Sequence, residues 1–451
     1  MIRLKRLLKL LGRLVKKLPK YLFIYLVIVT LVIGLVMNTK ANAYIKNKDL
    51  EKIKTYDDRL ALVDNIKDGI NLRLELIKNA QKSLDICYYL IDNSATSTVF
   101  LDQIIKAADR GVKIRLVTNK FNTSFRAKNS WRKDILANHT NIDFYYYENP
   151  WYNFYKLQDI NHDKVIIADG DYLLTGGRNI ADRFFIKNDD MVDDLDICVQ
   201  RKSDFSSIDN YMAYFERLIK IRPVKKVPSS DKAYEDLRKN LKESLKEIDK
   251  SFLVKESTMD KLNFRDVEMT FVHNGLDKVV KEPEILYYLG KLGENSQSIE
   301  WLSPYIIPTR PLRKLARFEK DNPKIKFITN SSKTTPNYPG FGGNLAYKSR
   351  TERYGDIYSY TGQGSIHTKA VLYDDGISAV GSFNLDPRST FLSTETMALV
   401  KSQEFQKDLK DYVDSRELAT WDEAKKDKPP LVKSIILFLV RILMYFFSPL
   451  V

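Results

Sequence analysis

Cysteine and histidine are scarce in this chain, with two cysteines and four histidines among 451 residues. The sequence has no CxxC pair and no closely spaced His/Cys set, so neither a disulfide framework nor a zinc site is expected. Cys87 and Cys198 each lie in an apolar run typical of a buried strand, which predicts two free thiols rather than a disulfide. We expect no metal ion and no cofactor.

Acidic residues are missing from the first 20 positions, which carry eight lysines and arginines. This segment accounts for eight units of the net charge of +15, so the other 431 residues carry only +7. A mildly basic body suits an anionic membrane surface or a phosphate-bearing substrate, and it does not single out nucleic acid as a partner. The apolar share of 44% is that of a folded globular protein.

Charged residues are also missing from positions 21–37. As a helix, this run would span about 25 Å, against about 30 Å for the hydrocarbon core of a membrane. We predict a transmembrane helix over residues 21–38, with the basic segment 1–20 in the cytoplasm and the rest of the chain outside. The alternative is a signal peptide cleaved at the Ala41-x-Ala43 pattern, but the apolar run is longer than the usual ~7–15 residues.

The other end of the chain is apolar as well. Residues 431–451 follow Pro429 and Pro430 and contain only two charges, Lys433 and Arg441. The uncharged stretch is too short to span a membrane, and Arg441 falls in its middle. We predict a helix that lies in the membrane interface; the alternative is a terminal helix docked on the protein's own core.

The body of the chain contains an internal repeat. Residues 70–119 follow the order helix, strand, helix, strand, and residues 283–330 follow the same order. Strands alternating with helices predict an α/β fold of two halves, 65–222 and 283–425, each with a mostly parallel sheet. Residues 223–282 are expected to form a charged linker with one helix at 233–250.

The repeat is closest in two segments, INHDKVIIADGDYLLTGGRN at 160–179 and SIHTKAVLYDDGISAVGSFN at 365–384. A chance match of this kind has a probability on the order of 10⁻³ or less at ordinary residue frequencies. In both copies a histidine is followed at the same offsets by four further residues. The matched residues are His162, Lys164, Asp169, Gly176 and Asn179 in the first copy, and His367, Lys369, Asp374, Gly381 and Asn384 in the second.

Each motif is predicted to form a hairpin in which the histidine and lysine share one face. If the turns centre on residues 170 and 375, residue i faces residue 340 − i in the first hairpin and 750 − i in the second. This register places each asparagine beside its histidine, and the glycines would leave room for a ligand atom. Asp169 and Asp374 fall in the turns, where we expect them to fix the hairpin or neutralise a charge rather than touch substrate.

A carboxylate on the second ring nitrogen would set the tautomer of each histidine. Glu395, just before an apolar strand, is the natural partner for His367 within the second half. Aligning the equivalent strand of the first half selects Asp194 for His162, although Asp190 has the same offset from its histidine as Glu395.

Two such hairpins in one pocket would bring together two histidines, two lysines and two asparagines. The lysines and amides form a receptor for a phosphodiester anion. One histidine could attack phosphorus while the other protonates the leaving oxygen, through a covalent phosphohistidine. The residues alone leave open which histidine takes which role.

At these residues the sequence resembles the phospholipase D superfamily, whose HxKxxxxD motif is present twice. GGRNIADRFF at 176–185 and GSFNLDPRS at 381–389 are similar to the bacterial cardiolipin synthase branch. The resemblance implies two packed α/β halves, no metal, and transfer of a phosphatidyl group to phosphatidylglycerol. It also implies that His162 is the nucleophile and His367 the acid/base.

Two other enzyme functions use the same catalytic groups. One is a hydrolase that releases phosphatidic acid with water as acceptor, and the other is a phosphodiester nuclease, which would need a more basic groove. A lipid-binding scaffold without activity would predict at least one eroded motif, and both motifs are complete. We therefore expect phospholipid substrates at a cell membrane, with the catalytic domain on its extracytoplasmic face.

The aromatic stretch 144–155 is predicted to contact lipid; the alternative is a strand at 142–147 and a packed loop.

Overall fold

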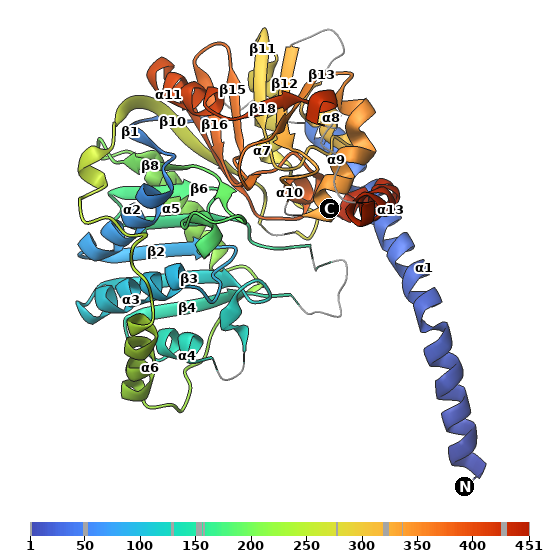
Figure 1. Ribbon diagram of the computed structural model, residues 1–451, viewed down its shortest axis with the longest axis horizontal. Helices are drawn as coiled ribbons and strands as arrows, with labels where there is room; N and C mark the ends of the chain where they lie inside the picture. The colour runs from blue at the N-terminus through green and yellow to red at the C-terminus, as the bar shows by residue number, and fades with distance from the viewer. Residues whose placement is uncertain are drawn as a thin grey trace.

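The computed structural model describes residues 2–47, 53–127, 130–149, 156, 158–276, 278–318, 324–335, 337–424 and 431–450. Two groups of strands and helices pack side by side, and one long helix, α1 (Ile2–Asn47), projects away from them (Figure 1). The aromatic stretch forms β4 (Ile142–Tyr147) as far as residue 147. Residues 150–155, which belong to the same predicted lipid-contacting stretch, lie outside the described residues.

A single 16-stranded sheet runs through both halves, in the order β18-β13-β12-β11-β15-β16-β17-β10-β1-β8-β6-β5-β2-β3-β4-β9. Each strand has its repeat counterpart the same number of strands away from the central β10–β1 pair. The first half supplies β1 (Tyr56–Val63), β2 (Ser83–Tyr88), β3 (Lys113–Asn119), β4, β5 (Lys164–Ala168), β6 (Tyr172–Gly176), β8 (Asp196–Gln200) and β9 (Val224–Lys226). The second supplies β10 (Arg265–His273), β11 (Ser298–Leu302), β12 (Lys324–Asn330), β13 (Gly355–Tyr360), β15 (Ala370–Tyr373), β16 (Ile377–Gly381), β17 (Thr396–Lys401) and β18 (Leu418–Thr420).

The helices cover this sheet and confirm the α/β class. In the first half they are α2 (Ile66–Asn79), α3 (Ala95–Asp109), α4 (Trp131–Ala137), α5 (Ser207–Leu218) and α6 (Tyr234–Lys246). In the second they are α7 (Glu284–Gly293), α8 (Arg310–Leu315), α9 (Tyr338–Thr351), α10 (Pro387–Phe391), α11 (Gln403–Asp414), α12 (Trp421–Ala424) and α13 (Leu431–Phe447). The predicted helices and strands at 70–119 and 283–330 are all present, with shifted ends.

Two features of the sheet differ from expectation. It is mixed rather than mostly parallel: β2-β3-β4 and β11-β12-β13 pair in parallel, and the other pairings in this sheet are antiparallel because hairpins and the central strands reverse direction. The segment 223–282 is also more than a linker. It contributes the edge strand β9 and the central strand β10, which pairs with β1 and β17.

The central strands join the two halves through one shared apolar core. Met269 of β10 and Leu60 of β1 lie in the same buried cluster, covered by Phe215 of α5 and Leu409 of α11. Cys87 and Cys198 are buried free thiols, as predicted. The halves therefore form one folded unit rather than two domains on a flexible tether.

The register predicted for the two motif hairpins is confirmed. Val165 pairs with Thr175 between β5 and β6, and Ala370 pairs with Val380 between β15 and β16. The Asp169 carboxylate accepts backbone N–H bonds from residues 81, 82 and 83, and that of Asp374 accepts them from residues 297 and 298. Each turn is thereby tied to the start of the neighbouring strand, which is a structural role rather than contact with substrate.

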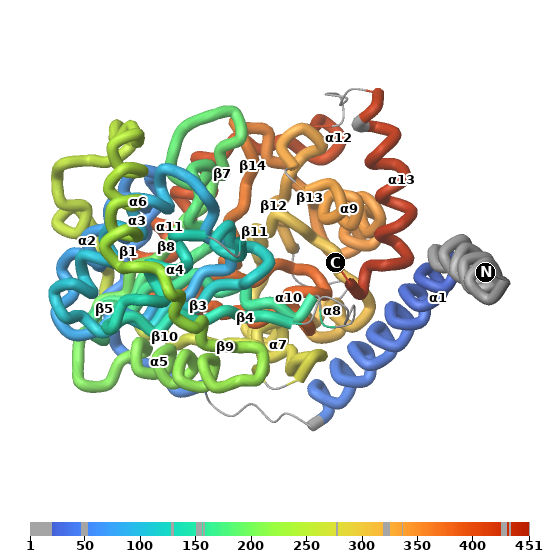
Figure 2. Tube along the Cα trace, turned by 90° about the horizontal axis from the view of Figure 1, so that it is seen from below, coloured from blue at the N-terminus to red at the C-terminus, as the bar shows by residue number. Residues whose placement is uncertain are grey.

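Within the described chain, one helix is long and apolar enough to cross a membrane, over residues 20–46. Its later part packs on the body, where Met37 and Ala41 join the core of the second half. Lys40 forms an ion pair with Glu282, with Nζ and Oε1 2.7 Å apart. Figure 2 shows α13 lying along α9 and close to α1.

Candidate active site

The two motif histidines are held by backbone pairing between the halves. The His162 N–H donates to the carbonyl of Thr394 at 3.0 Å, and the His367 N–H donates to that of Asp193 at 2.8 Å. A β-bridge joins Asn161 to Thr394, and β14 (Ser365–Ile366) pairs in parallel with β7 (Val192–Asp193). Each histidine thus lies next to a carboxylate of the other half, because Glu395 follows Thr394 and Asp194 follows Asp193 in the chain.

The carboxylates are consequently exchanged between the halves. His162 Nδ1 lies 2.9 Å from Glu395 Oε2, and His367 Nδ1 lies 2.7 Å from Asp194 Oδ2. Both predicted acids are in the site, but the prediction that each serves the histidine of its own half was wrong. The sequence offsets could not reveal the exchange, because it depends on which segments pair across the interface. Asp190 is exposed in a turn and takes no part.

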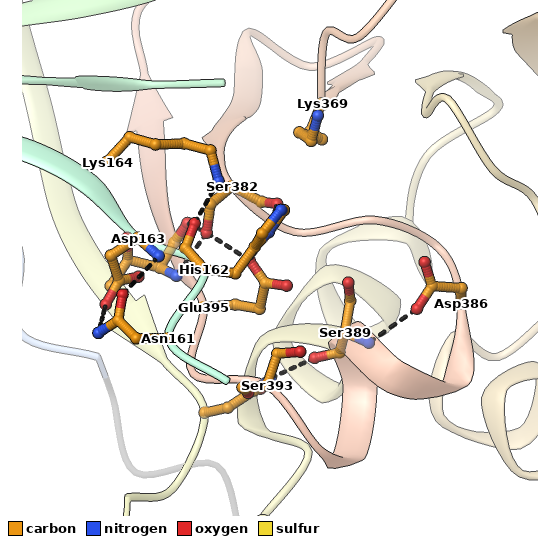
Figure 3. A network of polar contacts seen from close by, with 12 residues as sticks. Asn161, His162, Asp163, Lys164, Lys369, Ser382, Asp386, Ser389, Ser393 and Glu395 are labelled. Carbon is orange, nitrogen blue, oxygen red and sulfur yellow. Dashed lines mark hydrogen bonds and ion pairs between the residues drawn. The ribbon is translucent and has the colours of Figure 1, made fainter. Parts of the chain in front are cut away.

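Both lysines are buried in the same site. Lys164 Nζ donates to the carbonyl of His162, and Lys369 Nζ donates to that of His367 while lying 2.8 Å from its Nδ1. Figure 3 shows Lys164 joined to the network that holds His162 and Glu395, with Lys369 above this network in the same view. The charge of each lysine also acts on the histidine of the other motif, lowering its pKa. The two motifs therefore meet in one site.

Burial and the lysines favour the neutral form of both imidazoles. Burial, then Lys164 and Lys369, lower the pKa of His162 well below its usual value. Burial and Lys369 lower the pKa of His367 to about 3, although Asp194 opposes the shift. A neutral ring nitrogen carries the lone pair that a nucleophile needs.

The same burial shifts the pKa values of Glu395 and of both motif lysines. Burial raises the pKa of Glu395 to about 7, and it lowers the pKa of Lys164 to about 8 and that of Lys369 to about 7. A bound phosphate anion would favour the charged form of both amines. The site is therefore poised to gain positive charge when it binds an anion.

The predicted asparagines and glycines take different roles. Asn179 Oδ1 accepts the Leu90 N–H at 3.2 Å, whereas the buried Asn384 Oδ1 has no hydrogen-bond partner in the described chain. The prediction that the glycines leave room for a ligand atom was wrong. A Cβ at Gly177 would overlap the Asp194 carboxylate, and one at Gly381 would overlap the backbone of β17. The chain itself fills the space that glycine leaves.

A second repeated pair, Asn119 and Asn330, was missed by the sequence analysis. Asn119 Oδ1 accepts the Asn161 N–H at 3.1 Å, and Asn330 Oδ1 accepts the Ile366 N–H at 3.0 Å. Their side-chain amides donate back to the carbonyls of the same two residues. Each asparagine therefore fixes the residue before a motif histidine. The signal was present in the sequence, since both predicted strands end in Thr-Asn.

In each half, one tyrosine contacts the residue that lies between the histidine and the lysine of the motif. Tyr214 of α5 donates its hydroxyl to Asp163 Oδ2 at 2.5 Å, and the Tyr412 hydroxyl of α11 lies 2.6 Å from Thr368 Oγ1. Both contacts are buried and occupy equivalent places in the repeat. The hairpin ends are thus held from the helix side as well as from the other half.

Comparison with known proteins identifies the family of this chain. The family model described as "Cardiolipin synthase, PLD-like domain" matches residues 74–219 and 288–416. The chain belongs to this family. It is a phosphatidyltransferase of the phospholipase D type that acts on phospholipids, and its apolar N-terminal helix indicates a membrane protein.

Individual relatives cover most of the chain. An uncharacterised protein of Helicobacter pylori strain J99 is 25% identical over 424 residues, covering 82% of this chain and 80% of the relative. Cardiolipin synthase C of Escherichia coli strain K12 is 24% identical over 388 residues, covering 74% of this chain and 80% of the relative. The solved phosphatidylserine synthase of Haemophilus influenzae Rd KW20 has a TM-score of 0.66 at 13% identity, covering 92% of this chain and 99% of that chain, which supports the fold.

The exchanged carboxylates predict an energetic coupling across the halves. We expect His162→Ala and Glu395→Gln to be non-additive in thermal unfolding of the solubilised protein, with a coupling energy of about 1–3 kcal/mol. His367→Ala with Asp194→Asn should behave alike. The mismatched pairs, His162 with Asp194 and His367 with Glu395, serve as controls and should couple less. Stronger coupling in the mismatched pairs would contradict the observed pairing.

The pKa shifts predict a bell-shaped dependence of kcat/KM on pH. As pH falls through about 7, Glu395 gains a proton and no longer accepts from His162. As pH rises through about 7 to 8, the lysines lose the charge that binds phosphate. The alkaline limb of kcat should lie at higher pH, because bound phosphate stabilises the ammonium groups. Steady-state assays from pH 5 to 10 check this, and identical alkaline limbs for kcat and kcat/KM would disprove it.

Proposed function

We propose that this enzyme is a cardiolipin synthase, transferring a phosphatidyl group to the hydroxyl of phosphatidylglycerol through a phosphohistidine. The observation that carries the proposal is the pair of exchanged histidine–carboxylate contacts with both motif lysines in the same site. Such a site can supply a nucleophile, an acid and an anion receptor together. The matching family model and the cardiolipin synthases among the relatives support the choice of lipid.

In the first step, His162 Nε2 attacks phosphorus of the donor lipid. The new N–P bond forms as the bond to the glycerol oxygen breaks. His367 takes up a proton when the anionic donor binds, because the phosphate charge raises its pKa, and it passes that proton to the leaving oxygen. Glu395 accepts the N–H of His162 Nδ1, which leaves Nε2 unprotonated for attack. The lysine ammonium groups oppose the charge that builds on the phosphoryl oxygens.

In the second step, the acceptor hydroxyl attacks the phosphohistidine. His367, now neutral, takes the hydroxyl proton as the new O–P bond forms and the N–P bond breaks. The products are cardiolipin and an enzyme whose His367 carries the acceptor's proton. This proton passes to the leaving oxygen of the next donor, or to solvent once the lipid leaves and the pKa of His367 falls again. Asp194 stabilises this imidazolium through Nδ1.

Burial favours a lipid acceptor over water. His162 is only 5% exposed, and the His367 side chain is 16% exposed. A site that excludes water protects a reactive phosphoenzyme from hydrolysis. A nuclease is less favoured, because the body outside the N-terminal segment carries a net charge of only +7.

We predict that the detergent-solubilised enzyme converts labelled phosphatidylglycerol to cardiolipin and glycerol, followed by mass spectrometry. His162→Ala and His367→Ala should each lower turnover by at least about 10³-fold, because each removes a group needed in both steps. Arg238→Gln, on the distant helix α6, is the control and should retain full activity. Phosphatidic acid as the sole product would identify a hydrolase, and label trapped on His367 would exchange the histidine roles.

We further propose that α1 spans the membrane with its N-terminus in the cytoplasm and that α13 lies in the outer interface. The α13 helix rests on α9 through one face, with Leu437 buried, and leaves large apolar side chains such as Phe438 and Phe446 exposed. Its following turn, Ser448–Leu450, contacts α1 near Gly34, close to the end of the predicted span. The two predictions for α13 are thus compatible: it docks on the body and still offers a face to lipid.

Cysteine labelling tests this topology, since both native cysteines are buried. In cells with an accessible inner membrane, Asp249→Cys on the body should react with a membrane-impermeant maleimide. Lys9→Cys, in the N-terminal segment, should react only after permeabilisation. The reverse pattern would place the catalytic body in the cytoplasm.

A further inference from the structure

Two arginines occupy equivalent positions in the repeat, each 21 residues after its motif histidine. Arg183 lies in a short 3-10 helix, Asp182–Phe184, and Arg388 lies in α10. Both elements directly follow the motif hairpins. Neither arginine takes part in the two proposed catalytic steps.

Arg388 is a largely buried cation next to His162. Its charge acts on His162 and on Tyr89, whose ring packs edge-on against the His162 ring with centroids 4.9 Å apart. Its Nε is buried and has no hydrogen-bond partner in the part of the chain that is described. The nearby Asp386 does not pair with it and instead accepts the Ser389 N–H at 2.7 Å, capping α10.

Arg183 has the matching place beside His367. Its guanidinium lies over the Phe184 ring, 5.3 Å from the centroid, and that ring packs edge-on against His367 at 5.6 Å. The charges of Arg183 and Arg388 both act on the buried Tyr305, so both arginines lie near this residue. Among the described residues, no carboxylate forms an ion pair with either arginine.

The guanidinium of Arg388 is largely desolvated and no carboxylate of the described chain forms an ion pair with it, although the charges of Asp386 and Glu395 act on it from nearby. The best complement for such a group is a planar or tetrahedral oxyanion. The two lysines already provide for the phosphate that reacts. A second anion enters this site only if the acceptor brings one. Phosphatidylglycerol carries its own phosphodiester three carbons from the attacking hydroxyl, whereas water and simple alcohols carry none.

We propose that Arg183 and Arg388 together bind the phosphodiester of the acceptor lipid and so select an anionic acceptor over neutral ones. This inference rests on the proposed function and names the acceptor subsite within it. The two pairs of cations then have different roles, since the lysines bind the phosphate that is transferred and the arginines bind the phosphate that is not.

The partition of the phosphoenzyme tests this subsite apart from donor binding, because competing acceptors share one intermediate. The full-length solubilised enzyme is given labelled phosphatidylglycerol together with butan-1-ol, and the ratio of cardiolipin to phosphatidylbutanol is measured. Arg388→Gln and Arg183→Gln should each lower this ratio by about tenfold, the cost of a lost charge-assisted hydrogen bond. Total donor consumption should change by less than about threefold.

Three controls keep the outcome unambiguous. Arg238→Gln, which removes an exposed arginine paired with Asp109, should leave the ratio unchanged. Arg388→Lys should restore part of it, since a point charge remains. Arg183 is exposed, so its replacement tests the subsite even if the Arg388 variant folds poorly.

An unchanged ratio in active Arg183→Gln and Arg388→Gln enzymes would overturn the subsite and leave the proposed transfer intact. A fall in total turnover at a constant ratio would also overturn it, by assigning the arginines to the donor. A wild-type enzyme that forms phosphatidylbutanol and phosphatidic acid but no cardiolipin would instead refute the proposed acceptor, and the subsite with it.

Discussion

The active site depends on short parallel pairings between the halves, in which the residue before each histidine lies beside the residue before the other half's carboxylate. These contacts, Asn161 with Thr394 and Ile366 with Asp193, bring Glu395 to His162 across the interface. Backbone N–H···O bonds have donor–acceptor distances of about 2.7–3.2 Å, so this pairing fixes the separation of the two segments. A half folded alone would hold its histidine and lysine but would lack the carboxylate that orients the ring.

This exchange explains why so much of the structure serves the interface. The central strands β1 and β10 and the shared core under α5 and α11 make the halves one body, so neither hairpin can move without the other. The asparagines at the ends of β3 and β12 then hold the same two segments from within each half. Buried lysines and acids are tolerated there because each charge has a partner of opposite sign nearby.

Local features of the fold could be predicted from the sequence, and contacts across the interface could not. The hairpin register followed from turn residues and period-two alternation, and Val165 pairs with Thr175 as expected. The carboxylate partner of His162 could not be predicted in this way, because Asp194 and Glu395 have equivalent places in the repeat. Only the docking of the halves decides between them. The strands β1 and β10 were missed for a related reason: their pairing lies between segments far apart in sequence, and β10 falls in a charged stretch.

The repeat is not perfectly symmetric, and the difference bears on which histidine attacks. Gly177 leaves room for Asp194, whereas Ser382 donates its hydroxyl to Glu395 at 2.5 Å. Burial raises the pKa of Asp194, but Lys369 and His367 outweigh it and lower the pKa below its usual value; burial prevails at Glu395, whose pKa rises to about 7. An acid that stays ionised stabilises an imidazolium better than one that shares a proton near neutrality. This asymmetry supports the proposed roles, in which His367 carries the proton on the Asp194 side and His162 attacks phosphorus on the Glu395 side.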